Sequence, residues 1–259
     1  MWKIAIFCSV YNREKYIEKT LISVLNQTFN NFEFLIVDDW SSDKSYSILE
    51  KYSKIDNRIK CWKHENKWLI FEYNFLLSKT SKDVEYITWI DSDDEYVKDN
   101  LLFKLKAIDG FDAVVTNLQP INKIWHLLDF NNYYNDFFKY PLSIEKILVN
   151  LILKKNNLPI SYGTIFIRKN ILLEKWIINP TKNNKYSMWD FDLILRLFYE
   201  NKTCILNKRL LLYRIHDWQD SYKKTNQTRK DLIEVIYFFY KKEYISRSVC
   251  YLLVKNIYN

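Results

Sequence analysis

The sequence predicts an α/β fold with a mostly parallel central sheet flanked by helices. Over the first hundred residues, apolar runs of strand length alternate with amphipathic helical patterns, which is typical of a parallel sheet covered by helices. The chain has 259 residues, of which 48% are hydrophobic, so one large α/β domain has enough apolar residues for a sizeable core. Two of the apolar runs end abruptly in carboxylates, and this feature bears on function.

The first half of the chain alternates expected strands with expected helices. Apolar residues recur at helical spacing from Ile17 to Leu25, as expected for a helix that covers a sheet. Ser42 or Asp43 is the expected N-cap of the next helix. The expected strands are residues 3–10, 32–37, 58–64, 84–90 and 112–117. The expected helices are residues 13–27, 42–54, 69–80 and 98–108.

The second half has a weaker pattern. Asparagine and aromatic residues are abundant in 122–141, which we expect to be an extended or loop region. A helix capped by Ser143 should follow. The expected elements are a helix at 143–155, a strand at 161–168, a helix at 189–200, a strand at 208–216 and two amphipathic helices within 227–257.

The sequence gives few signals of a domain boundary, because the chain has only two glycines and four prolines. We expect one main domain over residues 1–222, with a first half at 1–97 and a second half at 98–222. Amphipathic helices at 223–259 complete the chain. Their apolar and aromatic residues alternate with lysine and arginine, so they either pack on their own domain or on a twin subunit, or lie on a membrane surface.

Composition limits the class of protein. The net charge of +8 indicates either an anionic partner or a composition biased toward lysine. The lysines are dispersed without a run of five, so nucleic acid is not an expected partner. No run of 18 apolar residues and no signal-peptide pattern occur, which predicts a cytoplasmic protein. The four cysteines have no paired spacing and are expected to be reduced, buried residues.

Polar clusters follow three of the expected strands. The first strand ends in Ser9 to Asn12, the second in Asp38 and Asp39, and the fourth in Asp91 to Asp94. Ligands of open parallel sheets bind outside the carboxyl ends of the strands, so these clusters are expected to meet at one edge. Carboxylates this close repel one another, and a divalent Mg²⁺ or Mn²⁺ shared with substrate phosphates relieves the repulsion. The alternative is a solvated turn and helix cap.

Four stretches together resemble the family-2 glycosyltransferases, which use nucleotide sugars. They are "IAIFCSVYNREKYIEKTLISVLNQTFNNFEFLIVDDWSSDKS", "WIDSDDEY", "WDFDLILRL" and "YRIHDWQDS", and with the segments between them they span about residues 3 to 221. The resemblance implies the GT-A fold, with a Rossmann-like, mostly parallel sheet and, in this chain, a C-terminal helical extension. It also makes 1–97 the nucleotide-binding half and 98–222 the acceptor half.

The resemblance assigns a donor site. Tyr11 is placed to stack on uracil, Asp39 to accept a hydrogen bond from the base, and Asp91 to hold the ribose. The residues that it places on the nucleotide are Ser9, Tyr11, Asn12, Arg13, Asp39, Asp91 and Ser92. Those that it places at a metal on the diphosphate are Asp93, Asp94 and His216, with the order of Asp93 and Asp94 left open.

The resemblance also assigns the chemistry. Asp190 matches the general base of an inverting transfer, in which a carboxylate takes the proton of the attacking hydroxyl. An N-terminal helix carboxylate interacting with the helix dipole is the alternative role. Asp192 is expected to be structural or a fallback base. The implied reaction moves a sugar from a UDP-sugar to a hydroxyl of a glycan, lipid-linked or protein-linked acceptor, with Mn²⁺ or Mg²⁺ as cofactor.

The chain departs from the family pattern at three positions. Trp40 stands where the family usually has a small residue, often glycine, and this affects the expected shape of the nucleotide pocket. Trp189 replaces an acidic residue before the expected base, and Ser9 replaces a common proline. None of these changes removes a group that the chemistry requires.

The sequence bears on three other classes of protein. A sugar nucleotidyltransferase needs a glycine-rich basic loop after the first strand, which "SVYNRE" does not provide. A receiver domain carries its acidic pair after the first strand, and this chain is too long for it. A catalytically degenerate sugar-binding or nucleotide-binding protein stays open, although Asp39, Asp91, Asp93 and Asp190 are all intact.

Overall fold

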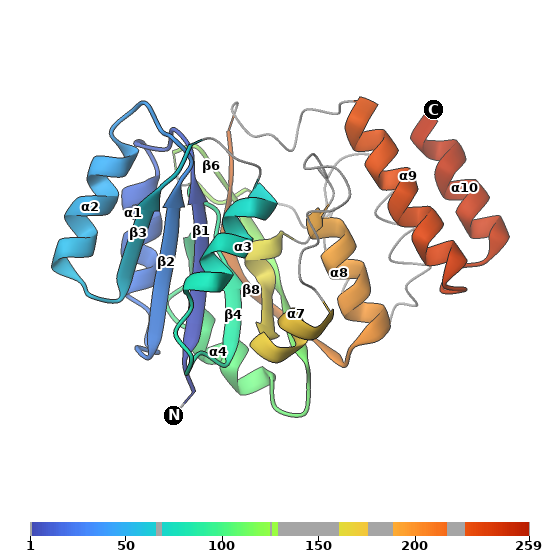
Figure 1. Ribbon diagram of the computed structural model, residues 1–259, viewed down its shortest axis with the longest axis horizontal. Helices are drawn as coiled ribbons and strands as arrows, with labels where there is room; N and C mark the ends of the chain where they lie inside the picture. The colour runs from blue at the N-terminus through green and yellow to red at the C-terminus, as the bar shows by residue number, and fades with distance from the viewer. Residues whose placement is uncertain are drawn as a thin grey trace.

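The computed structural model describes residues 2–65, 69–124, 126–128, 161–175, 189–216 and 226–258. Within these residues the centre of the molecule is an eight-stranded sheet of order β3-β2-β1-β4-β7-β6-β8-β5. Figure 1 shows the sheet with helices on both faces and the two C-terminal helices side by side at one end. The predicted α/β fold, with a central sheet flanked by helices, is confirmed.

Four strands form the parallel half of the sheet. They are β1 (Ile4–Val10), β2 (Phe32–Asp38), β3 (Ile59–Lys63) and β4 (Tyr86–Trp89). β1 pairs with β2 on one side and β4 on the other, so Val10 lies opposite Asp38 and Phe7 lies opposite Trp89. The three strands that end in polar clusters, β1, β2 and β4, are therefore adjacent, as expected. Their carboxyl ends meet at one edge of the sheet, as the strand-end clusters predicted.

Four strands form the mixed half of the sheet. They are β5 (Glu95–Tyr96), β6 (Ala113–Asn122), β7 (Ile165–Arg168) and β8 (Thr203–Ile215). β7 is antiparallel to both β4 and β6, β6 is parallel to β8, and β5 is antiparallel to β8. The pairing of β5 with β8 brings the chain that follows the acidic loop against the end of β8. This contact connects segments about 120 residues apart.

Helices cover both faces of the sheet. They are α1 (Ile17–Leu25), α2 (Ser45–Ile55), α3 (Leu69–Lys79), α4 (Asn100–Ala107), α7 (Lys169–Lys175), α8 (Trp189–Glu200), α9 (Asn226–Lys241), α10 (Arg247–Tyr258) and the short 3₁₀ helix η1 (Tyr162–Thr164). Alternate residues of β1 belong to different hydrophobic cores. Ala5 and Phe7 lie in the core that also contains residues of α3, α8, α9 and α10. Ile4, Ile6 and Cys8 lie in the core that contains residues of α1, α2 and α4. This is the period of two expected of a strand buried on both faces.

Some element boundaries differ from those expected. The N-cap of α2 is Lys44 rather than Ser42 or Asp43, although Asp43 Oδ1 accepts the backbone N–H of Ser45 at 2.9 Å. The predicted position is therefore wrong by one or two residues, while the predicted type of interaction is present one residue outside the cap. β6 and β8 are longer than predicted, and α7 and the two-residue β5 were not predicted. The expected helix at 143–155 lies outside the described residues, as does most of 122–141.

The C-terminal helices pack on the rest of the chain. Val235, Ile236 and Phe239 of α9 and Leu253 of α10 are buried in the same core as β1 and α8. The Tyr199 ring of α8 stacks on the Tyr244 ring with centroids 4.5 Å apart. Packing on the chain's own domain, one of the alternatives for these helices, is thus present; contact with a membrane or a twin subunit stays a prediction. No helix in the described ranges is both long and apolar enough to span a bilayer.

Candidate active site

The loops after β1 and β2 are joined by hydrogen bonds. Asp39 donates its backbone N–H to the carbonyl oxygen of Val10 at 2.8 Å. Asn12 donates its backbone N–H to Ser41 Oγ at 2.9 Å, and Asn12 Oδ1 accepts the N–H of Ser42 at 2.9 Å. Asn12 has a φ of 52°, in the left-handed region that asparagine tolerates better than most residues. These bonds place the predicted nucleotide-binding residues of both loops at one rim.

Asp38 and Asp39 differ in environment although they are adjacent. Asp38 is fully buried, and its Oδ1 accepts the backbone N–H of Ser41 at 2.9 Å. Asp39 is half-buried at the rim, one position beyond the end of β2. The first carboxylate therefore shapes the turn, whereas the second is accessible to a ligand. The contact of Asp39 with the base stays a prediction.

The acidic loop after β4 becomes more buried along the chain. Asp91 is half-buried, Asp93 is 8% exposed and Asp94 is fully buried. Burial raises the pKa of Asp94 well above its ordinary value, and the charges of Asp91 and Asp93 add to the increase. The three carboxylates therefore lie close enough to repel one another, as the sequence predicted.

Asp94 is held from behind by two other elements. Its Oδ1 accepts the backbone N–H of Arg214 at 2.8 Å, and its carbonyl oxygen accepts a hydrogen bond from Thr20 Oγ1 at 2.7 Å. Its Oδ2 has no hydrogen-bond partner in the described part of the chain. These contacts attach the loop to β8 and α1, and they leave Asp94 Oδ1 bonded to the backbone of β8.

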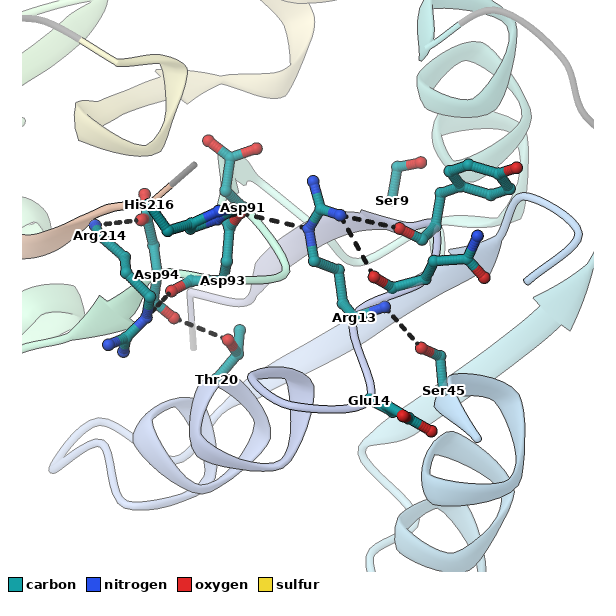
Figure 2. Close-up of polar contacts among 12 residues, drawn as sticks. Ser9, Arg13, Glu14, Thr20, Ser45, Asp91, Asp93, Asp94, Arg214 and His216 are labelled. Carbon is teal, nitrogen blue, oxygen red and sulfur yellow. Dashed lines mark hydrogen bonds and ion pairs between the residues drawn. The ribbon is translucent and has the colours of Figure 1, made fainter. Parts of the chain in front are cut away.

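Asp93 is the meeting point of three segments (Figure 2). Its Oδ2 lies 2.8 Å from His216 Nε2 and 3.2 Å from Arg13 Nε. His216 follows β8 and is packed against the Tyr16 ring, with ring centroids 5.0 Å apart. The structure thus brings together Arg13, Asp93 and His216, which the sequence predicted for one site although they are far apart in the chain.

Arg214 positions the backbone of the acidic loop. The side chain is fully buried, and its Nε donates to the carbonyl oxygen of Asp93 at 2.7 Å. Its Nη2 donates to Glu95 Oε1 at 2.6 Å. The sequence analysis did not single out this residue, although it stands two positions before His216 in "YRIH". The signal that could have identified it is an arginine that interrupts the apolar run from Leu210 to Ile215.

The donor atoms near Asp93 fit a divalent ion that is completed by substrate. In the described residues, no three His, Cys, Asp or Glu side chains form a ready cluster for a metal. Asp93 and His216 nevertheless converge to 2.8 Å, and the Asp91 carboxylate belongs to the same loop. Mg²⁺ and Mn²⁺ usually take only one or two protein carboxylates, with phosphate oxygens and water in the other positions. Two converging protein ligands agree with that requirement.

Tyr162 is a site residue that the sequence analysis missed. It lies in η1, and its hydroxyl donates a hydrogen bond to Asp91 Oδ1. Its ring also lies edge-on to the ring of Tyr73, with centroids 5.9 Å apart. Because the contact joins residues 71 positions apart, no local pattern could have revealed it. Tyr162 therefore orients the carboxylate that the resemblance places on the ribose.

Lys104 supports the same region from the core. It is fully buried on α4, and its Nζ donates to Thr88 Oγ1 at 3.0 Å and to the carbonyl oxygen of Gly163 at 3.1 Å. The ammonium also lies 4.9 Å from the centroid of the Tyr96 ring. Burial lowers the pKa of Lys104 to about 7. This lysine therefore connects β4, β5 and η1 behind the acidic loop.

Asp190 is the second residue of α8, and the structure describes its backbone only. Its role as the base therefore stays a prediction. Asp192 accepts a hydrogen bond at Oδ1 from Arg196 Nε at 2.9 Å, and burial raises the pKa of its carboxyl. The pairing with Arg196 is compatible with the structural role, one of the two alternatives for Asp192.

Two solved structures of GT-A glycosyltransferases share this fold. S. aureus TarS in complex with UDP-GlcNAc superimposes with a TM-score of 0.68 at 20% identity, over 99% of this chain and 72% of that chain. The mannosyltransferase PcManGT from Pyrobaculum calidifontis, in complex with GDP-Man and Mn²⁺, gives a TM-score of 0.60 at 15% identity, over 92% of this chain and 64% of that chain. These likenesses establish the GT-A fold.

Within that class, the chain belongs to Glycosyl transferase family 2, whose sequence model matches residues 5–175. GlyA of Streptococcus pneumoniae is 28% identical over 220 residues, which cover 82% of this chain and 30% of GlyA. The putative teichuronic acid biosynthesis glycosyltransferase TuaG of Bacillus subtilis is 32% identical over 137 residues, or 48% of this chain and 54% of TuaG. The chain therefore matches about a third to a half of the length of these two relatives. The family resemblance seen in the sequence is confirmed.

Proposed function

We propose that this protein is a metal-dependent, inverting glycosyltransferase that moves a sugar, a hexose or an N-acetylhexosamine, from a UDP-sugar to a hydroxyl of an acceptor. One observation carries the proposal. Asp93 Oδ2 and His216 Nε2 converge to 2.8 Å beside Asp91, at the sheet edge that also carries Tyr11 and Asp39. A site with this layout has separate groups for the base, the ribose and the diphosphate.

The donor is positioned by the chain's own residues. We place the base beside Tyr11 and Asp39 and the ribose beside Asp91, whose carboxylate Tyr162 orients. Asp93 and His216 would hold the divalent ion, with Asp94 as a further candidate, and the ion supplies positive charge that stabilises the departing diphosphate. Arg13, 3.2 Å from Asp93, adds a second positive charge at this position. Ser9, Asn12 and Ser92 complete the predicted donor site.

The attacking hydroxyl needs a base on the opposite side of the sugar. We assign this role to Asp190 at the start of α8, where a carboxylate takes the proton as the new glycosidic bond forms. Attack opposite to the leaving diphosphate inverts the configuration at the anomeric carbon. The hydroxyl oxygen gains the bond to carbon, the bond to the diphosphate breaks, and the proton moves to the carboxylate.

A UDP-sugar donor and a glycan acceptor are supported by the relatives. TarS is described in complex with UDP and with UDP-GlcNAc, and the name of TuaG refers to teichuronic acid biosynthesis. PcManGT, described with GDP-Man and Mn²⁺, shows that the same fold accommodates another base. We therefore propose uridine as the base and a glycan, lipid-linked or protein-linked hydroxyl as the acceptor.

The deciding experiment separates binding from chemistry. Purified protein with Mn²⁺ or Mg²⁺ is screened against nucleotide sugars by thermal shift and by release of nucleoside diphosphate. Asp190→Asn is expected to abolish turnover while UDP affinity stays nearly unchanged, because only the base is removed. Glu200→Gln, at the far end of the same helix, is the matched control and should retain turnover. Full turnover in Asp190→Asn would refute the assigned base.

A further inference from the structure

Trp40 combines two unfavourable features that packing does not explain. Its φ of 67° lies in the left-handed region, which a bulky side chain rarely adopts. Its side chain is also 56% exposed, although an indole gains free energy by burial. Strained backbone of this kind persists where the surrounding structure enforces it and is concentrated at ligand sites. The usual glycine of the family at this position would avoid both costs.

The hydrogen bonds between the two loops bring the chain at Trp40 close to the chain at Tyr11. The residues before them are joined by the 2.8 Å bond from Asp39 N–H to Val10 O. The residues after them are joined by the 2.9 Å bond from Asn12 N–H to Ser41 Oγ. Tyr11 is itself 48% exposed. Two exposed aromatic residues therefore lie on adjoining loops at the same rim, and Asp39 directly precedes Trp40 in the chain.

Trp40 is supported on one side by a lysine. Lys63 Nζ lies 5.4 Å from the centroid of the Trp40 ring and 5.1 Å from that of Tyr46. The same ammonium donates to the carbonyl oxygen of Ser41 at 3.2 Å, so its position is fixed by the turn that carries the indole. A cation over an indole face restrains the ring, because the negative face of the ring attracts the charge.

The rings of Tyr11 and Trp40 do not stack on another aromatic ring in the described part of the chain. Among the ring–ring and cation–ring contacts of the described residues, none involves Tyr11, and the one at Trp40 is with the Lys63 ammonium. Planar bases stack on such platforms regardless of sequence, because every base has a π-face. Two exposed rings that stack on no other ring in the described residues, close to a carboxylate, have the composition of a site for a planar base that also donates a hydrogen bond.

We propose that Trp40 is a specificity-determining residue that forms a second aromatic wall of the nucleobase site, opposite Tyr11 and next to Asp39. The proposal rests on the nucleotide-sugar function given above and deepens it. It assigns to Trp40 the recognition of the flat, aromatic character of the base, whereas Asp39 recognises its hydrogen-bonding edge. The strain at Trp40 is then retained because glycine would not supply the wall.

The test compares four proteins with two ligands. Wild type, Trp40→Gly, Trp40→Phe and Trp2→Gly are titrated calorimetrically with UDP and with 5,6-dihydrouridine diphosphate in the presence of Mg²⁺. The dihydro base keeps its hydrogen-bonding edge but loses its aromatic plane. Trp2 is the matched control, because it is 55% exposed and lies outside the site.

We expect Trp40→Gly to bind UDP about tenfold more weakly, the loss of one base–aromatic stack, and Trp40→Phe to recover most of the affinity. The preference for UDP over the dihydro analogue should fall in Trp40→Gly and persist in Trp2→Gly. Glycine suits the left-handed backbone, so Trp40→Gly should melt at or above the wild-type temperature. Equal UDP affinity and an equal preference in wild type and Trp40→Gly would overturn the proposal.

The outcomes also separate this proposal from the proposed function. If wild type binds no nucleoside diphosphate, the donor assignment itself is wrong. If wild type binds UDP tightly and Trp40→Gly binds it equally well, the donor assignment stands and only the second wall is refuted.

Discussion

The guanidinium Nε of Arg214 donates to the carbonyl oxygen of Asp93 across 2.7 Å in a fully buried position. Through this bond β8, the last strand in the chain, fixes the position of the backbone in the acidic loop. The same side chain is paired with Glu95 at 2.6 Å, and the backbone N–H of Arg214 holds Asp94. Two residues of the acidic loop and the first residue of β5 are therefore all held by one arginine, which stands two residues before His216.

Replacing Arg214 should therefore destabilise the protein strongly. Arg214→Ala removes the hydrogen bonds that this side chain gives to Glu95 and to the Asp93 carbonyl, and removal of one member of a buried pair costs about 3–5 kcal/mol. Arg214→Lys should recover little, because an ammonium cannot reproduce the planar fork. Urea unfolding gives the free energy. Arg209→Lys, an exposed change on the same strand, is the control, and a stable Arg214→Lys would contradict the argument.

Asp93 and Asp94 should differ in their effect on nucleotide binding. Asp93 Oδ2 faces both His216 and Arg13, whereas Asp94 directs Oδ1 to the backbone of β8. Asp93→Asn is expected to weaken metal-dependent UDP binding by tenfold or more. Asp94→Asn keeps the oxygen that accepts from Arg214 and should retain most of the affinity.

Calorimetric titration of UDP with and without Mn²⁺ checks this difference. The control is the metal-free titration, in which the two variants should behave alike. If Asp94→Asn loses the metal effect and Asp93→Asn keeps it, Asp94 is the ligand. That result would reverse the order that the geometry favours.

The parts of the site that lie at strand ends could be predicted from the sequence. Apolar runs that end in carboxylates identify the edge at which ligands bind, and the order of β2, β1 and β4 placed Asp39 and Asp93 at that edge. His216 was recognised by its surrounding motif. These signals are local, so a single chain displays them without its structure.

The supports behind the loop could not be predicted, because they are contacts between distant segments. Tyr162 reaches Asp91, and Lys104 reaches Gly163, without any local pattern that marks the partners. The strand β5 has two residues, too few to show a period, yet its pairing with β8 carries Asp94 into the interior. A buried lysine also contradicts the usual rule that lysines are exposed.

Lys104 should make the stability depend on pH. The folded-state pKa is about 7, whereas the unfolded chain holds the proton to about 10.5, so the unfolded state binds more protons between these values. The free energy of unfolding should therefore rise with pH from about 7 toward 10, and the cost of burying the charge should be complete below pH 7. Lys104→Met should remove this rise and stabilise the protein most at low pH.

Urea unfolding at several pH values between 6 and 9 measures the slope for Lys104→Met and wild type. Lys106→Met, an exposed change on the same helix, should leave the slope of the wild type intact. Parallel curves for wild type and Lys104→Met would show that the buried ammonium does not titrate in this range.

Tyr162 should affect donor binding more than stability. Its hydroxyl donates to Asp91 Oδ1, the carboxylate assigned to the ribose, so Tyr162→Phe leaves that carboxylate without one of its donors. A net contribution of about 1 kcal/mol corresponds to roughly a fivefold change in affinity. Tyr162→Phe is expected to raise KM for the donor by about this factor with a smaller change in kcat, because the base and the leaving-group contacts remain.

Steady-state kinetics at varied donor concentration separates the two parameters. Tyr251→Phe, at a side chain that is 70% exposed on α10, is the matched control. An unchanged KM with a reduced kcat would instead place Tyr162 on the acceptor side of the reaction.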